Sequence, residues 1–219
     1  MGGPVIILGA CGLGRIALDI LQRNDIVVYG FLDDDKALQG QVVNDVLVLG
    51  NTTEERYLDL IGERCDVFIA TEHRAQRERM VAMLREQNQV VSINAIHPST
   101  IIAASAVLGY GNLLNTSVSL GTDATLGNHC ILHTRAAIEH GVVIKDFVQV
   151  GAGSVVGAGA TLNEHVFVGA GATIVAGVEI GRAASIGAGA VVLSNVKAGE
   201  IVLGNPAKPV KGMTGSLGL

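Results

Sequence analysis

The stretch VFVGAGATIVAGVEIGRAASIGAGAVV, residues 166–192, carries an aliphatic residue at every sixth position. The period starts at Ile102 and runs to Val192 without a slip, which makes sixteen consecutive aliphatic positions. A fixed short period means that the chain repeats one structural unit, so this region is a repeat architecture. Aromatic residues make up only 3% of the chain and Trp is absent, which also favours thin, repetitive packing of aliphatic side chains.

A small or β-branched residue stands four places after nearly every aliphatic position, with Asn112 as the exception. Such a hexad forms one short flat strand, whose aliphatic side chain points inward, and one corner. Three hexads close a triangular coil, so residues eighteen apart stack and sixteen hexads make about five coils. Glycines one place after the inward residue, such as Gly151 and Gly157, are expected to suit the turns, where a Cβ would carry a penalty. The pattern resembles the left-handed parallel β-helix of the hexapeptide-repeat proteins, which implies an acyltransferase that assembles as a trimer.

Residues 1–95 lack the six-residue period and alternate apolar stretches with stretches at helical spacing. The expected strands lie within residues 4–14, 26–35, 66–72 and 90–97, and the expected helices at 15–23 and 74–87. Strands that alternate with helices predict a parallel, half-Rossmann-like α/β sheet. We therefore expect two domains: a Rossmann-like nucleotide-sugar-binding domain over residues 1–95, and an all-β, left-handed β-helix acyltransferase domain with a C-terminal tail over residues 96–219.

The first expected strand leads into a Gly-rich turn that contains Gly9, Gly12 and Gly14. A turn from strand to helix presents backbone N–H groups where a phosphate can bind. Asp33 follows at about the distance along the chain at which an acid meets a ribose. The order Gly-x-x-Gly-x-Gly differs from the dinucleotide motif, and about ninety residues are few for a dehydrogenase. A nucleotide-sugar module fits this length better, with a plain tight turn as the alternative.

The composition of the chain limits its partners and its compartment. The net charge of −5 argues against nucleic acid, which would need a basic surface. No apolar run approaches the roughly 18 residues of a membrane span, so we expect no membrane partner. Cys11, Cys65 and Cys130 are an odd and widely spaced set, which predicts free thiols in the reducing cytoplasm rather than disulfides or a zinc site.

Six short motifs, in their order along the chain, resemble the sugar O- and N-acyltransferases typified by NeuD and PglD. They are GACGLG (9–14), GFLDDD (30–35), FIA (68–70), NAIHPST (94–100), HTRAAIEH (133–140) and GNPAKPV (204–210). The resemblance covers nearly the whole chain. It implies transfer of an acetyl group from acetyl-CoA to an amine or hydroxyl of a sugar, often a nucleotide-linked amino sugar. It also implies a homotrimer, with CoA in the groove between two β-helices and the nucleotide on the N-terminal domain.

This resemblance makes His140 the general base of the reaction. The attacking amine or hydroxyl must lose a proton, and an imidazole titrates close to the working pH. Because His140 stands two places after inward Ile138, we expect an outward-pointing corner side chain, with a merely solvated histidine as the alternative. Glu139 would either orient His140 or face solvent. The backbone of Gly157 and Ala158, one coil later, would supply the N–H donor for the oxyanion.

The other residues that match the family are expected to line two ligand sites. The nucleotide sugar is expected to contact Gly9, Gly12, Leu13, Gly14, Asp33, Asp34, Arg77 and His133. CoA is expected to contact Gly157, Ala158, Gly204, Asn205, Pro206, Ala207 and Lys208, with Lys208 or Lys211 meeting its phosphates. No metal is expected.

Four positions depart from the family's pattern. Gly141 stands where some relatives have an acid after the base, and Gln149 where some have a second histidine. Leu13 replaces a common histidine of the Gly-rich turn, and Glu72 replaces a common glycine after the third expected strand. These departures leave open a nucleotide-sugar-binding protein without catalytic activity.

A γ-class carbonic anhydrase-like metalloenzyme is a further alternative on the same β-helix. It needs three histidines on one zinc ion, and His133 and His140 could be two of them. His129 and His165 are expected to be surface corner residues and His97 to be structural, so the sequence offers no third ligand.

Overall fold

The computed structural model describes residues 3–88 and 90–210 and divides the chain into two compact units, Met1–Pro98 and Ser99–Leu219. The first unit is built on a five-stranded sheet with the order β3-β4-β2-β1-β5. Its strands are β1 (Val5–Leu8), β2 (Val28–Leu32), β3 (Val42–Val43), β4 (Val46–Gly50) and β5 (Asp66–Ile69). Its helices are α1 (Gly12–Arg23), α2 (Glu55–Leu58) and α3 (Arg74–Asn88). β4, β2, β1 and β5 run parallel, so the predicted half-Rossmann-like sheet is confirmed.

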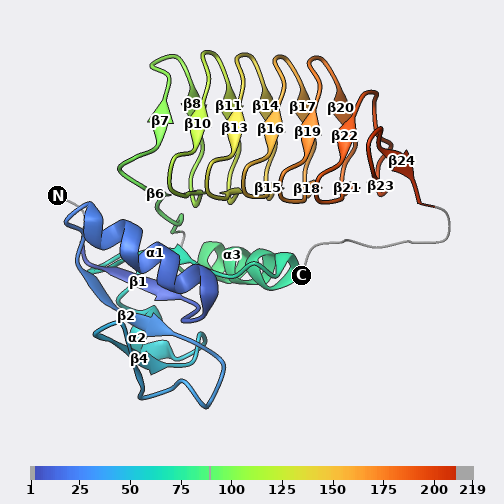
Figure 1. Ribbon diagram of the computed structural model, residues 1–219. Coiled ribbons are helices and arrows are strands. Elements are labelled where there is room, and N and C mark those ends of the chain that lie inside the picture. The colour runs from blue at the N-terminus through green and yellow to red at the C-terminus, as the bar shows by residue number, and fades with distance from the viewer. Residues whose placement is uncertain (1–2, 89, 211–219) are drawn as a thin grey trace. The chain divides into compact units, whose positions relative to one another are not determined.

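β1 is the centre of this sheet because its whole run of side chains is apolar. All four residues of Val5–Leu8 are 0% exposed, as expected for a parallel strand covered on both faces. α1 packs against β1 and β2, and its buried face includes Leu13, Ala17 and Leu21 (Figure 1). Because the four strands are parallel, their carboxyl ends share one edge of the sheet, and the Gly-rich turn follows β1 at this edge.

The first unit also corrects the sequence prediction in two places. The hairpin of β3 and β4 was not predicted, although its turn is Asn44-Asp45, with positive φ angles of 46° and 65°. Two such residues between apolar runs are the usual turn of a two-residue β-hairpin. The strand expected within residues 90–97 is reduced to β6 (Ala95–Ile96), preceded by a segment that hydrogen-bonds β5 through the Ile93 N–H and the Val67 carbonyl at 2.9 Å.

The second unit is a parallel β-helix, as predicted, in which two-residue strands alternate with turns (Figure 1). From β7 (Ile101–Ile102) to β19 (Thr173–Ile174), each strand pairs with the strand eighteen residues later, so that Leu120 stacks on Ile138 and Ile138 on Val156. The strands are β7 (Ile101–Ile102), β8 (Val107–Leu108), β9 (Leu113–Leu114), β10 (Ser119–Leu120), β11 (Thr125–Leu126), β12 (Ile131–Leu132), β13 (Ala137–Ile138), β14 (Val143–Ile144), β15 (Gln149–Val150), β16 (Val155–Val156), β17 (Thr161–Leu162), β18 (Phe167–Val168), β19 (Thr173–Ile174), β20 (Glu179–Ile180), β21 (Ser185–Ile186), β22 (Val191–Val192), β23 (Ile201–Leu203) and β24 (Lys208–Pro209).

The exception in the repeat, Asn112, has a structural explanation. Its side chain is fully buried, and its Oδ1 accepts the Cys130 N–H at 2.7 Å while its Nδ2 donates to the Gly127 carbonyl at 2.9 Å. The amide therefore links its own coil to the next one. A buried polar group that is hydrogen-bonded on both sides is compatible with an apolar interior.

The repeated glycines have a different role from the predicted one. Glycines one place after the inward residue do not have positive φ; a Cβ on Gly157, for example, would lie 2.6 Å from the Ala176 nitrogen of the next coil. Positive φ occurs two places later, at Gly141 and Gly153 for instance. The first glycine therefore permits close stacking of coils, and the second supplies the left-handed backbone of the turn.

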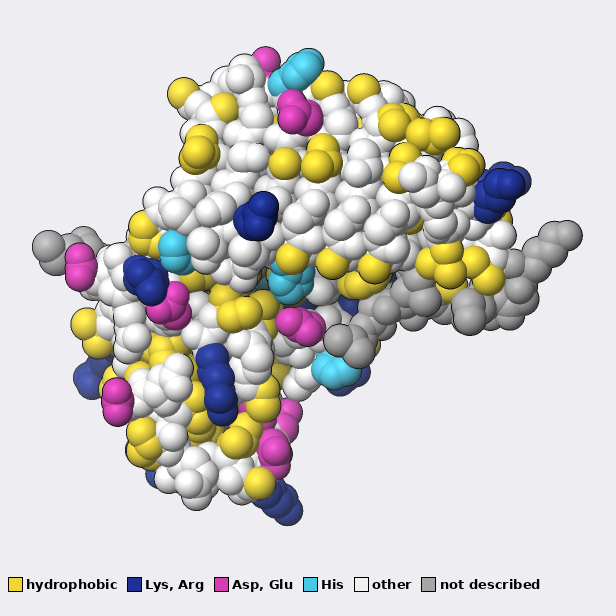
Figure 2. All heavy atoms as spheres, viewed as in Figure 1, with side chains coloured by type: hydrophobic (Ala, Val, Ile, Leu, Met, Phe, Trp, Pro, Cys, Tyr) yellow, Lys and Arg dark blue, Asp and Glu magenta, His cyan; other side chains and the backbone are white. Residues whose placement is uncertain are grey.

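The outward faces of the β-helix carry few charges. The outward residues of the sheet that contains β13 are Ile101, Ser119, Ala137, Val155, Thr173 and Val191. The space-filling view shows the same predominance of uncharged side chains on the visible face (Figure 2). Within residues 3–88 and 90–210, no helix has the length and apolarity needed to cross a bilayer.

A matched pair of valines in β16 tests the inward assignment of the repeat. Val156 is 0% exposed and Val155 is 37% exposed. We expect Val156→Ala to lower the free energy of unfolding by about 2 kcal/mol, because buried methyl groups are lost and a cavity remains. Val155→Ala should change it by less than about 0.5 kcal/mol. Chemical denaturation measures both, and equal losses would contradict the assignment.

Candidate active site

His140 lies in the turn that follows β13, between Glu139 and Gly141. The backbone of this turn is hydrogen-bonded to both neighbouring coils: the Gly159 N–H donates to the His140 carbonyl at 3.0 Å, and the Gly141 N–H donates to the Thr122 carbonyl at 2.9 Å. Its imidazole is exposed, as predicted. The fold therefore presents a solvent-accessible imidazole on a backbone that is hydrogen-bonded to both neighbouring coils. Gly141 has a φ of +65°, which explains why a glycine suits the place where some relatives have an acid.

Glu139 is also exposed, and its backbone N–H donates to the Val156 carbonyl at 3.0 Å. Within the described residues its carboxylate makes no hydrogen bond to His140. Of its two predicted roles, this arrangement favours a solvent-facing side chain over one that orients the base.

Gly157 and Ala158, the two predicted N–H donors for the oxyanion, differ in their hydrogen bonds. The Gly157 N–H already donates to the Ile174 carbonyl at 2.8 Å, so it is not available to an oxyanion and this prediction is corrected. Gly157 instead permits the close stacking of two coils. Ala158 lies one coil beyond His140, and its N–H has no partner in the part of the chain that the structure describes. The turn that holds it is closed by the Ala160 N–H and the Gly157 carbonyl at 3.1 Å, with Gly159 at a φ of +66°. Ala158 is thus the fixed N–H donor nearest in register to His140.

His133 lies at a different corner of the β-helix, in the turn after β12. Its Nε2 lies 3.0 Å from the Nε2 of Gln149, which belongs to the strand stacked on β12. One of the two groups must accept, so either the imidazole is unprotonated at Nε2 or the amide presents its oxygen instead. Gln149 therefore orients His133, and the described chain does not bring this pair to the corner of His140.

His129 occupies the third corner, and the prediction that it is a surface residue was wrong. It is 2% exposed, and its ring stacks on Phe147 at 5.2 Å and meets Tyr110 edge-on at 5.3 Å. His165 stacks on the other side of Phe147 at 5.6 Å and is half-buried. Residues eighteen apart form an aromatic ladder that sequence reasoning missed, although the repeat frame places them in one column. Within the described residues, no three His, Cys, Asp or Glu side chains form a group that could hold a metal.

The Gly-rich turn of the first unit is shaped by close backbone packing. Gly9 has a φ of +110°, and a Cβ on it would lie 2.5 Å from the Ala70 carbonyl oxygen. A Cβ on Gly14 would overlap the Gly9 carbonyl oxygen. The N–H groups of Gly12, Leu13 and Gly14 have no partner in the described chain, as is usual for the first turn of a helix. Three aligned donors at the N-terminus of α1 are able to bind phosphate.

Two aspartates at the end of β2 have distinct roles. Asp33 braces the Gly-rich turn, because its Oδ2 accepts the Ala10 N–H at 2.7 Å and its Oδ1 accepts the Asp35 N–H at 2.9 Å. Asp34 is fixed through Oδ1, which accepts the N–H and the hydroxyl of Thr52 at 3.0 and 2.7 Å. Asp34 is exposed, and its second carboxylate oxygen accepts no hydrogen bond within the described residues. Thr52 was missed by sequence reasoning because the strand before it, β4, was missed.

Two predicted contact residues are internal to the described structure. The Leu13 side chain is 3% exposed and belongs to the apolar face of α1. Arg77 is 2% exposed, and its Nη1 donates to the Thr71 carbonyl at 2.8 Å, so it holds the loop after β5. Both predictions are therefore corrected. Leu13 has only its backbone available to a ligand, and the buried Arg77 side chain stabilises the loop after β5 instead of facing a ligand.

The GNPAKPV motif forms the turn and second strand of a hairpin at the end of the β-helix. β24 pairs antiparallel with β23, and the hairpin is joined to β22 by the Ala207 N–H and the Val191 carbonyl at 2.8 Å. Gly204, Asn205, Pro206 and Lys208 are exposed, so they are accessible to a ligand. Lys211 lies outside the described residues.

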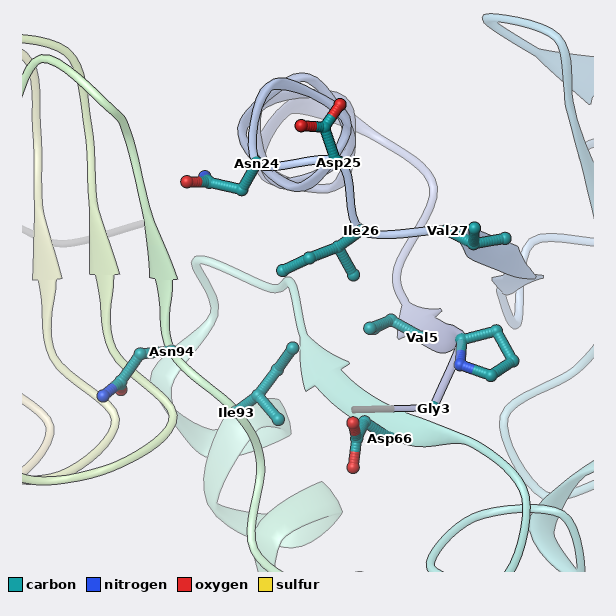
Figure 3. A pocket seen from close by; sticks show the side chains of 10 residues that line it. Gly3, Val5, Asn24, Asp25, Ile26, Val27, Asp66, Ile93 and Asn94 are labelled. Atoms are coloured by element: carbon teal, nitrogen blue, oxygen red, sulfur yellow. The ribbon is translucent and has the colours of Figure 1, made fainter. Parts of the chain in front are cut away.

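A cavity of about 760 Å³ lies at the opposite edge of the sheet in the first unit. The side chains of Val5, Ile26 and Ile93 lie around it, and Asp66 stands at the start of β5 (Figure 3). The amino-terminal ends of β1 and β5 form this edge, whereas the Gly-rich turn follows the carboxyl end of β1. The cavity is therefore separate from the candidate phosphate site.

Comparison with known proteins finds similarity in both units of the chain. The PglD N-terminal domain family matches residues 4–84. GDP-perosamine N-acetyltransferase from Caulobacter crescentus, solved with CoA and GDP-perosamine, matches at 26% identity and a TM-score of 0.88, over 95% of this chain and 97% of that one. That structure carries one histidine replaced by alanine, and a second structure of the same enzyme carries asparagine there.

Two further solved structures share the whole architecture. The acetyltransferase domain of PglB from Neisseria gonorrhoeae, in complex with acetyl-CoA, matches at 25% identity and a TM-score of 0.88, over 96% of this chain and 100% of that one. WeeI from Acinetobacter baumannii matches at 25% identity and a TM-score of 0.69, over 94% of this chain and 99% of that one. The search of curated proteins found no relative.

Proposed function

We propose that this chain transfers the acetyl group of acetyl-CoA to the amine of a nucleotide-linked amino sugar. The proposal is supported by the match of residues 4–84 to the PglD N-terminal domain family and by the acetyltransferase structures that match the chain along nearly its whole length. The observation that carries the proposal is the exposed His140 on a rigid turn, with the free Ala158 N–H one coil later. Neither arrangement is needed to hold the β-helix together, since the inward residues do this.

The reaction follows from these two groups. The neutral sugar amine attacks the thioester carbonyl, and the imidazole of His140 takes the proton that the nitrogen loses as the C–N bond forms. The carbonyl oxygen becomes an oxyanion, which accepts the Ala158 N–H. Collapse of the tetrahedral intermediate breaks the C–S bond, and the imidazolium returns the proton to the departing CoA thiolate. The products are the N-acetylated sugar and CoA thiol.

The first unit is proposed to bind the nucleotide part of the substrate. The three free N–H groups at the start of α1 are proposed to bind the diphosphate, and the second oxygen of Asp34 a ribose hydroxyl. The exposed GNPAKPV hairpin and Lys208 are proposed to contact CoA. Thr52, which fixes Asp34, would position this ligand without contacting it.

We further propose a homotrimer in the cytoplasm. The uncharged outward strand faces, with Ile101 72% and Val107 61% exposed, suit burial between copies of the β-helix. Cys11 is exposed and free, and Cys65 and Cys130 are buried and free, which fits a reducing compartment.

The proposed activity is tested by following the release of free CoA thiol with a panel of UDP-, GDP- and dTDP-linked amino sugars. We expect release with at least one member, and none with the same nucleotide linked to a sugar whose amine is replaced by hydroxyl. A protein that binds a nucleotide sugar tightly in calorimetry, yet releases no thiol with any amine, would instead be the non-catalytic binding protein.

A further inference from the structure

Asp123 lies in the turn that precedes the turn of His140 by one coil of the β-helix. The two turns are stacked directly on each other: the Gly141 N–H donates to the Thr122 carbonyl at 2.9 Å, and a Cβ on Gly121 would lie 2.8 Å from the His140 nitrogen. Asp123 is exposed, as is His140. This corner of the β-helix therefore carries a carboxylate and an imidazole in adjacent turns.

The carboxylate of Asp123 does not hold the fold together. It forms no hydrogen bond or ion pair within the described residues; only the Asp123 N–H is engaged, with the Ser105 hydroxyl at 3.0 Å. Asp123 has a φ of 57°, and the next three coils place glycine at the equivalent position, where Gly141, Gly159 and Gly177 have φ angles of 65°, 66° and 70°. Glycine adopts this conformation without strain, whereas aspartate does so at some cost. The fold thus keeps a side chain where a glycine would be sufficient.

The other charged group of this corner points away from Asp123. The stacked turns of the corner are residues 103–105, 121–123, 139–141, 157–159 and 175–177. Their titratable side chains are those of Asp123, Glu139 and His140. At the position of Glu139 the Cβ points along the axis towards the next coil, as the closeness of a Cβ on Gly121 to the following turn shows. Glu139 therefore extends towards the coil of Ala158, and Asp123 alone lies on the other side of the imidazole.

A histidine that accepts a proton at Nε2 must carry its own proton at Nδ1. The hydrogen bond made by one ring nitrogen decides which of the two is protonated. Nδ1 is the nitrogen nearer the backbone, so an acceptor in the neighbouring turn meets Nδ1, while Nε2 points outward. A carboxylate at Nδ1 selects the required tautomer, and it stabilises the imidazolium that forms when Nε2 takes a proton.

We propose that Asp123 is a positioning residue for the base: its carboxylate accepts the Nδ1–H of His140 and leaves Nε2 free for the amine proton. This inference rests on the proposed function. Hydrogen bonds of this kind often tighten only when substrate binds, and both side chains are free to turn towards each other. The Nδ1–H stays on the ring throughout the reaction, and the proton taken at Nε2 is the one returned to the CoA thiolate. Asp123 contacts neither substrate.

The kinetic test follows CoA thiol release by the full-length protein. We expect Asp123→Asn and Asp123→Gly to lower kcat by about threefold to tenfold, the effect of an exposed charge-assisted hydrogen bond, and to leave both KM values within about twofold. Asp123→Glu keeps the carboxylate and should recover part of the rate. Glu164→Gln, which removes an acid from a turn at another corner, should leave kcat unchanged. In a His140→Ala background, Asp123→Asn should have no further effect, because Asp123 acts through the imidazole.

A spectroscopic test reads the tautomer without turnover. ¹⁵N NMR of the histidine rings at about pH 9, where imidazoles are neutral, shows which nitrogen carries the proton. The signals of His140 are identified by their loss in His140→Ala. We expect mainly the Nδ1–H form in the wild type and a shift towards the Nε2–H form in Asp123→Asn. Asp123→Gly should melt within about 3 °C of the wild type, because no structural hydrogen bond is lost.

Four results would overturn the role of Asp123. They are an unchanged His140 tautomer in Asp123→Asn, a tautomer shift in Glu139→Gln or Thr122→Val instead, a kcat within about twofold of the wild type in both Asp123 variants, and a large drop in their melting temperatures. A wild type that releases no thiol with any amino sugar would refute the proposed function. The NMR comparison would then still decide whether Asp123 holds the imidazole.

Discussion

Replacement of His140 by alanine is expected to lower kcat by about a hundredfold to ten-thousandfold, the usual cost of losing a general base. The imidazole is exposed and holds no neighbouring group, so its removal should leave the fold intact. The rate of CoA thiol release measures the effect at saturating acetyl-CoA and sugar. The melting temperature and the affinity for nucleotide should stay as in the wild type.

His165→Ala serves as the matched control for this change. His165 also lies in a turn of the β-helix, but it stacks on Phe147 at the third corner and is proposed to take no part in catalysis. Its removal should cost some stability and leave kcat within about twofold. A His140→Ala enzyme that retains a rate within about threefold of the wild type would exclude His140 as the base.

Ala158→Pro is expected to lower kcat by about a hundredfold to a thousandfold, because it deletes one N–H donor of the oxyanion. The turn tolerates this change: a Gly157 carbonyl closes on the Ala160 N–H, and Gly159 has a φ of +66°. Proline is favoured at the second position of such a turn. The Ala158 N–H has no structural partner in the described chain, so no hydrogen bond of the fold is lost.

Ala188→Pro provides the control for proline itself. Its turn has the same form, with the Ala190 N–H on the Gly187 carbonyl at 3.2 Å and Gly189 at a φ of +66°, but it belongs to another corner. It should keep kcat within about threefold. An Ala158→Pro enzyme that is folded and fully active would show that the oxyanion is held by another donor.

The repeat made the β-helix predictable almost residue by residue. One inward aliphatic position every six residues fixes strand, corner and stacking partner at once, so the exposed position of His140 followed from Ile138 alone. Side-chain contacts between coils were harder to predict from the sequence. The burial of His129 depends on Tyr110 and Phe147, which lie nineteen and eighteen residues away.

In the first unit, sequence motifs did not predict which side chains are free to contact a ligand. Asp33 was expected to face a ribose, yet both of its oxygens accept backbone N–H groups, because the Gly-rich turn and the end of β2 lie side by side. Leu13 and Arg77 were matched to ligand positions by motif, whereas helix phase and packing bury both side chains. Spacing identifies which residues gather at an edge, but burial decides which of them remain available to a ligand.

The most direct test of the central claim is the structure of the product. The wild type is incubated with acetyl-CoA and the amino sugar of the panel that releases the most thiol, and the product is examined by NMR and mass spectrometry. The account predicts one new acetyl group per sugar, attached to the sugar nitrogen, and no such product with His140→Ala under the same conditions. Thiol release with no acetylated sugar, or an acetyl group found on a hydroxyl oxygen, would contradict it.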